Sequence, residues 1–332
     1  MIVDEALAAW LGDKARHARS LSLSIETNRK FRALPGFRRL EDSLAAADPN
    51  SSEAVLEAAR TFLEDVSAIE SCGATLVDAA RSDLFFRPSL RTASSEVHHG
   101  LLLFDQPRLT IFISVASAEA VAAKRLGRTG GASIVFPGKL SLYKFIKAGG
   151  ATLSFWQAPE IEPGFSAAGS GTCRRVEQRR LNDGETFALD GRRESFVVDH
   201  AQSDMVYLHA ATPLDAAPLT VEYDCDSLEF VGASSTDEAS SRAQMMLALL
   251  RTMDRRDAAP VFEAMLNSPH FYTRWAAMRD FLALDCERAL PHLQRMAESD
   301  AHPEVREAAG ETLAILFPDD QAGQTEEQPC LA

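Results

Sequence analysis

The chain has 332 residues, of which 46% are hydrophobic and 25% are charged, a composition typical of a soluble globular protein with two or three domains. Its net charge is −14, and more than half of that charge lies after residue 230, which makes a nucleic-acid partner unfavourable. No segment approaches the roughly 18 consecutive apolar residues that a membrane span needs, and Asp4 and Glu5 stand where a secretory signal would be basic. We therefore expect a cytoplasmic protein with no membrane partner.

Residues 1–82 are predicted to form an N-terminal helical region. Apolar residues recur at helical spacing near the start, and a second helix is expected over residues 38–46, before the breaker Asp48-Pro49-Asn50. Ser51 or Ser52 can cap a longer helix after that breaker. One apolar stripe runs along this helix: Val55, Leu56, Ala59, Phe62, Leu63, Val66 and Ile69.

Residues 83–232 are predicted to form a β domain, because the hydrophobic period changes from helical to alternating. The predicted strands cover residues 97–104, 109–115, 133–136, 140–146, 152–157, 174–181, 186–189, 195–199, 205–209 and 219–223. One helix, residues 117–126, interrupts them. Many short strands separated by turns favour an antiparallel sandwich or barrel over alternating β–α units.

Residues 233–317 contain an internal repeat. Arg242, Arg274 and Arg306 recur at a fixed interval. When the segments are aligned on these arginines, Met246 coincides with Met278. At the next apolar position Leu249 coincides with Phe281 and Leu313. Small residues, Ala277 and Ala309, fall where two helices must approach closely. The first repeat helix is expected to begin at Ser234 or Ser235. The acidic segment 318–332 has no basic residue and is predicted to be a disordered tail.

The segment Asp300-Ala301-His302-Pro303-Glu304-Val305-Arg306-Glu307-Ala308-Ala309 resembles the start of an inner helix in HEAT and related phycobilin-lyase-type repeats. The resemblance implies a stack of helix pairs that offers a surface to a protein partner. The alternative is that the repeats only support the β domain.

The segment from Leu181 to Arg192, with its two glycine turns around a short strand, resembles a strand–turn–strand step of cupin-like jelly rolls. Together the regions imply an α+β multidomain protein with N-terminal helices, an antiparallel cupin-like barrel and C-terminal HEAT-like repeats. The cupin resemblance implies a barrel that holds a small molecule, a peptide or a metal ion.

Cupin enzymes usually present two histidines separated by one residue, a glutamate and a later histidine to one metal ion. Here His98 and His99 are adjacent, so on a strand they point to opposite faces, and Glu96 shares a face with His98. If Gln202-Ser203 closes a hairpin, His209 pairs with Phe196 and lies too far from His200 to share an ion. We therefore expect no metal cofactor.

The alternative set is iron or another divalent metal held by ligands drawn from Glu96, His98, His99 and His209.

Four residues are predicted to line a ligand site in the barrel: Tyr143, Trp156, Tyr207 and His209. The indole of Trp156 can stack on a ligand, although a core position is the alternative role. Arg174-Arg175 and Arg179-Arg180 leave both faces of one strand polar. That pattern indicates a solvated edge strand or, as the alternative, a site for an anion or an acidic partner.

The sequence contains no Gly-rich phosphate loop, no nucleophile elbow and no HExxH motif. We therefore predict a non-catalytic or accessory binding protein, with a small molecule or peptide in the barrel and a protein partner on the repeats. The alternative is a metal-dependent cupin-type enzyme, an oxygenase or an isomerase.

Overall fold

A computed structural model describes residues 5–126, 133–162, 165–166 and 169–318. The chain divides into two compact units. The first holds residues 1–160, 171–217 and 221–232, and the second holds residues 161–170, 218–220 and 233–332. Boundaries at residues 82, 232 and 317 stay predictions, and the predicted tail lies outside the described residues except for Pro318. No helix in the described ranges is long and apolar enough to cross a membrane.

The N-terminal helical region is confirmed. Its helices are α1 (Glu5–Leu11), α2 (Lys14–Arg32), α3 (Pro35–Ala46), α4 (Ser52–Glu64) and α5 (Val66–Ser82). Ser51 caps α4, since its hydroxyl accepts from the Ala54 N–H at 3.1 Å. A single helix running through to Ile69 is wrong, because Asp65 ends α4 and its carboxylate caps α5 by accepting from the Ala68 N–H.

Every predicted strand is present, and the structure adds two short ones, β1 and β12. The strands are β1 (Thr92–Ser94), β2 (His98–Gln106), β3 (Leu109–Ala116), β4 (Ser133–Phe136), β5 (Leu140–Lys147), β6 (Thr152–Gln157), β7 (Arg174–Arg180), β8 (Thr186–Asp190), β9 (Glu194–His200), β10 (Met205–Thr212), β11 (Leu219–Asp224) and β12 (Phe230–Ser235). The helix α6 (Ala118–Leu126) interrupts them as expected.

The strands form three antiparallel sheets. The largest has the order β1-β2-β3-β10-β5-β8, and the others are β12-β11-β4 and β7-β6-β9. The arginine-rich β7 therefore lies at the edge of its sheet, and nearly all its residues are exposed, as its polar faces predicted.

The predicted hairpin between β9 and β10 is wrong. β9 pairs with β6, whereas β10 lies between β3 and β5, so His209 stands opposite Phe112 and Tyr143. The connecting turn instead contacts the loop between β5 and β6. The backbone N–H groups of Gln202 and Ser203 both donate to the carbonyl of Gly149, at 2.8 and 3.1 Å. The turn therefore lies against that loop, and the two strands that it joins pair with different neighbours.

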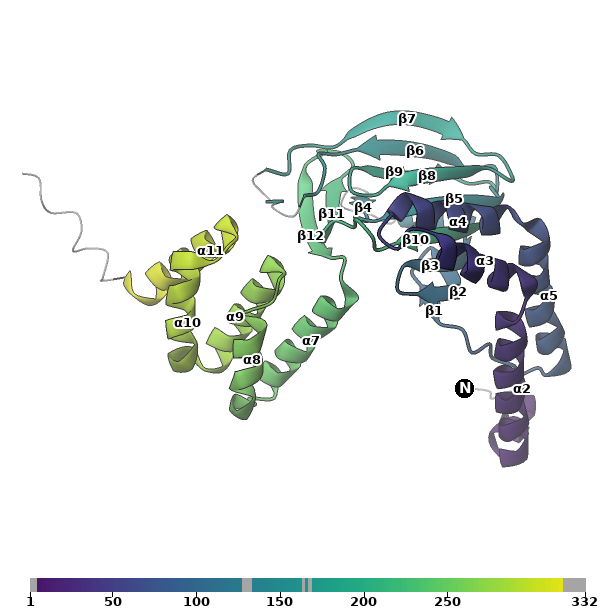
Figure 1. The fold of residues 1–332 in the computed structure, drawn as a ribbon, viewed down its shortest axis with the longest axis horizontal. Helices are drawn as coiled ribbons and strands as arrows, with labels where there is room; N and C mark the ends of the chain where they lie inside the picture. The colour runs from purple at the N-terminus through teal and green to yellow at the C-terminus, as the bar shows by residue number, and fades with distance from the viewer. Residues whose placement is uncertain (1–4, 127–132, 163–164, 167–168, 319–332) are drawn as a thin grey trace, which may run out of the picture. The chain divides into compact units, whose positions relative to one another are not determined.

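Strands β5 and β10 of the six-stranded sheet are covered on both faces. On one face Leu142, Leu208 and Ala210 belong to one core with the N-terminal helices, and α4 lies over β5 and β10 (Figure 1). On the other face Phe145 and Tyr207 pack with aromatic side chains from the smaller sheet. Because β10 alternates between these faces, the sheet separates a helical layer from an aromatic interior.

The second unit is a helical array, and its described helices are α7 (Glu238–Thr252), α8 (Ala259–Met265), α9 (Phe271–Leu284), α10 (Cys286–Ser299) and α11 (Pro303–Leu316). A 3₁₀ turn, Arg256–Ala258, precedes α8. Ala277 and Ala309 are fully buried in its core, as the repeat predicted.

The repeated arginines make the same contact in two repeats. Arg274 Nη1 donates to the Ser268 carbonyl at 3.0 Å, and Arg306 Nη1 donates to the Asp300 carbonyl at 2.6 Å. Each guanidinium thus ties the start of its own helix to the loop before it. Arg274 also reaches the next repeat, since its Nε and Nη2 donate to the buried Asp300 carboxylate at 2.8 and 2.6 Å.

The predicted register is wrong for the first repeat. Met246 and Leu249 are 59% and 50% exposed, whereas Leu247 is 2% exposed and packs in the core. Arg242 is exposed and pairs with Glu238 on its own helix. The helix begins at Glu238, not at Ser234 or Ser235, because the Asp237 carboxylate provides the cap.

The burial of Leu247 and the exposure of Met246 can be tested by replacing each of the two residues, in turn, with aspartate. We expect Leu247→Asp to lower the free energy of unfolding by about 3 kcal/mol or more, since it buries a carboxylate without a partner. Met246→Asp should change it by roughly 0.5 kcal/mol, because that side chain faces solvent. Chemical denaturation followed by circular dichroism measures both, and equal losses would restore the original register.

Candidate ligand-binding site

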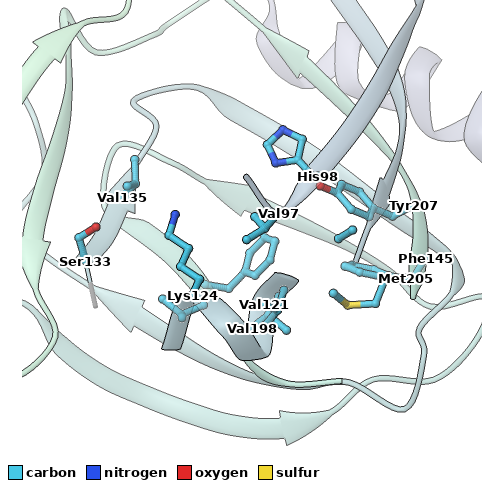
Figure 2. Close-up of a pocket in the computed structure, with 13 residues that line it drawn as sticks. Val97, His98, Val121, Lys124, Ser133, Val135, Phe145, Val198, Met205 and Tyr207 are labelled. Carbon is cyan, nitrogen blue, oxygen red and sulfur yellow. The ribbon is translucent and has the colours of Figure 1, made fainter. Parts of the chain in front are cut away.

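The first unit contains a cavity of about 280 Å³ between α6, β9 and β10. Its walls are mainly apolar, with Val121, Phe145, Val198 and Met205 among them (Figure 2). The polar side chains that line it are His98, Lys124, Ser133 and Tyr207. A mostly apolar chamber with a few polar groups is the usual form of a small-molecule site.

A tight turn before β2 fixes the orientation and the tautomer of His98. Ser95 Oγ accepts from the backbone N–H groups of Val97 and His98, both at 3.3 Å, and lies 2.8 Å from His98 Nδ1. Because both lone pairs of the hydroxyl accept from the backbone, its hydrogen donates to Nδ1. The proton of the neutral ring is then on Nε2, so His98 is a donor there.

The ring of His98 is held neutral. Burial lowers the pKa of His98, and the nearby charges of His99 and Lys124 lower it further. Burial raises the pKa of Tyr207, and a hydrogen bond from Ser114 offsets only part of that effect. Lys124 is therefore the cation of this site, with two neutral hydrogen-bonding side chains beside it.

Tyr143 and His209 lie beneath the cavity, in the aromatic interior. Their rings stack with centroids 4.4 Å apart and planes 7° from parallel, and His209 Nε2 lies 3.2 Å from Ser141 Oγ. Burial lowers the pKa of His209 to about 4. Tyr207 lies 6.3 Å from Tyr143, centroid to centroid, and connects this pair to the cavity wall.

Trp156 does not join this group. Its neighbour Phe155 packs among the interior aromatic rings, and a bulge in β6 follows between the two residues. The indole nitrogen of Trp156 is buried, and it has no hydrogen-bond partner among the described residues. Of the four predicted ligand residues, the structure brings Tyr143, Tyr207 and His209 together and leaves Trp156 apart.

The candidate metal ligands are dispersed. His98 faces the cavity, whereas His99 faces a separate groove on the other side of β2 and lies 3.1 Å from Ser94 Oγ, as the alternation of a strand requires. Glu96 precedes the strand and is 82% exposed. Within the ranges that the structure describes, no three His, Cys, Asp or Glu side chains converge on one point. The absence of a metal cofactor stays a prediction.

Lys124 and Ser95 are the residues that sequence reasoning missed. Lys124 follows Val121 by one helical turn, so both reach the same side of α6. A cation one helical turn after an apolar residue on a short, alanine-rich helix was the available signal. Ser95 gave none, since its role depends on the turn that it closes.

Comparisons with known proteins give a family match for one part of the chain. The family model of HEAT repeats matches residues 232–314. This part of the chain consists of HEAT repeats. No protein with a curated function matches the chain.

Solved structures that match the chain include cupins. A cupin domain from Bordetella pertussis Tohama I is 10% identical, covers 36% of this chain and 97% of its own, and has a TM-score of 0.22. A sugar phosphate isomerase of the cupin superfamily from Silicibacter pomeroyi is 9% identical and has a TM-score of 0.25. The match covers 45% of this chain and 90% of the isomerase. Ectoine synthase from P. lautus is 13% identical and has a TM-score of 0.23. The match covers 37% of this chain and 68% of the synthase. No residue role is transferred from these structures.

The buried His209 should make stability depend on pH. Its folded pKa of about 4 lies below the usual 6.5, so below pH 6.5 the unfolded chain binds a proton that the folded chain excludes. We expect this residue to lower the free energy of unfolding by about 2 kcal/mol when the pH falls from 7 to 4.5. His209→Phe keeps an aromatic ring on Tyr143 and should remove that part of the loss.

Tyr143→Phe is the matched control, because it alters the same stacked pair without removing a group that titrates in this range. Urea denaturation at pH 7 and pH 4.5 gives the comparison. A loss in His209→Phe as large as in the unmodified protein would show that His209 already binds its proton in the folded state.

Proposed function

We propose that this chain is a non-catalytic or accessory binding protein of the cytoplasm. Its β domain holds a small apolar molecule, and its HEAT repeats offer a surface to a protein partner. The observation that carries the first part is the cavity between α6, β9 and β10, with apolar walls and few polar side chains.

The arrangement of the polar groups supports binding over catalysis. The described side chains that line the cavity include no cysteine or carboxylate, and their hydroxyl groups are those of Ser133 and Tyr207. The alternative, a metal-dependent cupin-type oxygenase or isomerase, requires about three converging ligands. Glu96, His98, His99 and His209 do not supply them in this arrangement.

An exposed stripe on α7 supports the protein-partner part of the proposal. Met245, Met246 and Leu249 on this first repeat helix, and Met253 directly after it, are between 50% and 71% exposed. Methionine side chains are flexible and adapt to varied apolar surfaces, which suits them to protein contacts. The side chains that hold the repeat together, such as Leu247, are on the buried side of the helix.

The cavity can be tested with 4-phenylbutan-1-ol, a neutral probe of suitable size. We expect it to bind with a dissociation constant on the order of 1 mM or tighter, given its small number of non-hydrogen atoms. Val121→Trp should weaken binding about tenfold or more by filling the chamber from α6. Isothermal titration calorimetry measures both constants.

Val66→Trp is the matched control, because it makes the same change at a 62% exposed position on α5. It should bind the probe as the unmodified protein does. Binding that is absent altogether, or that is equal in both tryptophan variants, would contradict the proposed site.

Metal content separates the binding protein from the enzyme. We expect the purified protein to contain no stoichiometric iron, zinc, manganese or nickel by inductively coupled plasma mass spectrometry, and to gain no thermal stability on metal addition. One equivalent of metal, lost in His98→Ala and in His209→Ala, would favour the enzyme.

A further inference from the structure

The polar groups of the cavity gather toward one side of it. In Figure 2 the Lys124 nitrogen, the His98 imidazole and the Tyr207 oxygen lie toward one side, and Val121, Val198 and Met205 lie toward the other. A ligand in this chamber therefore meets an apolar environment along most of its length and hydrogen-bonding groups at one end.

The groups at that end are hydrogen-bond donors. Lys124 offers an ammonium, and His98 offers Nε2–H because Ser95 occupies Nδ1. The Tyr207 hydroxyl also lines this part of the cavity, and a phenol can donate as well as accept. No aspartate or glutamate of the described ranges lines the cavity. The site thus presents one positive charge and several donors, and no negative charge.

The charge of Lys124 is only weakly neutralised. Among the described residues its ion-pair partner is Glu96, at 3.7 Å, and that carboxylate is 82% exposed while Lys124 is 39% exposed. An exposed pair at this distance contributes little, because water screens both charges. A carboxylate that entered beside the apolar walls would be screened less and would meet Lys124 and His98 together.

We infer that the ligand of this cavity is an apolar molecule with a terminal carboxylate, which Lys124 and His98 bind while the apolar body lies against Val121, Val198 and Met205. This inference rests on the proposed function, since it specifies the ligand class of the same cavity. Lys124 is its specificity-determining residue.

Three probes of one skeleton test the inference: 4-phenylbutanoate, 4-phenylbutan-1-ol and 4-phenylbutylamine. They share their apolar part and differ in the charge of the terminal group. By calorimetry at pH 7 we expect the acid to bind about tenfold more tightly than the alcohol, as charge-assisted hydrogen bonds are stronger than neutral ones. The amine should bind most weakly, since Lys124 repels it.

Variants of the ion pair give the decisive comparison. Lys124→Met keeps a linear side chain without its charge, so the acid should lose about tenfold and the alcohol, which loses a weaker hydrogen bond, about threefold or less. Glu96→Gln removes the competing carboxylate, so the acid should bind about twofold to threefold more tightly. A general loss of folding would weaken acid binding in both variants, so it does not explain changes in opposite directions.

The outcomes separate the two claims. If the alcohol binds as well as the acid, and Val121→Trp still blocks both, the carboxylate inference is overturned and the proposed cavity stands. A preference for the acid that survives in Lys124→Met overturns the role of Lys124. If none of the three probes binds, the proposed function fails, and the ligand class fails with it.

Discussion

The first unit depends on the two-residue alternation of one central strand. Along β10, Leu208 and Ala210 point to the N-terminal helices, and Tyr207 and His209 point to the aromatic interior. A shift of one residue would place a histidine and a tyrosine under the helices and leave the interior without its stacked pair. The helical layer, the aromatic interior and the cavity wall are therefore all set by one register.

The polar groups of the cavity come from two places: His98 is held by the Ser95 turn, and Lys124 carries a positive charge. Ser95 closes a turn at the start of β2, and that turn determines which nitrogen of His98 carries hydrogen. Lys124 comes from α6, a separate element, and brings the only permanent charge among the side chains that line the described cavity. The proposed binding of a carboxylate thus draws on β2 and α6, two elements that are not adjacent in sequence.

Local elements were predictable here, and long-range pairing was not. The strands followed from alternation and turn residues, and the cap at Ser51 followed from a serine placed directly after a helix breaker. The predicted neighbour of β10 was wrong because β10 lies between β3 and β5, strands far from it in sequence, and no local pattern encodes such pairing.

The candidate site divides in the same way. Tyr143, Tyr207 and His209 share strand faces and lie together, and their role in ligand binding stays a prediction. The contribution of Lys124 depends on the packing of α6, which spacing does not show. Trp156 follows Phe155, whose ring packs in the interior, so strand alternation turns the indole away. The predicted register of the first repeat was also wrong, because Leu247 is buried at the place where a fixed repeat interval would bury Met246.

The double contact of Arg274 has a consequence for how the HEAT repeats unfold. One guanidinium binds the loop of its own repeat and the buried carboxylate of the next, so neither repeat can open without exposing an unpaired charge in the other. Repeat arrays otherwise fray from their ends, one unit after another. Here the last two repeats are expected to behave as one cooperative block, and fraying is confined to the side of the array where Arg242 makes no such contact.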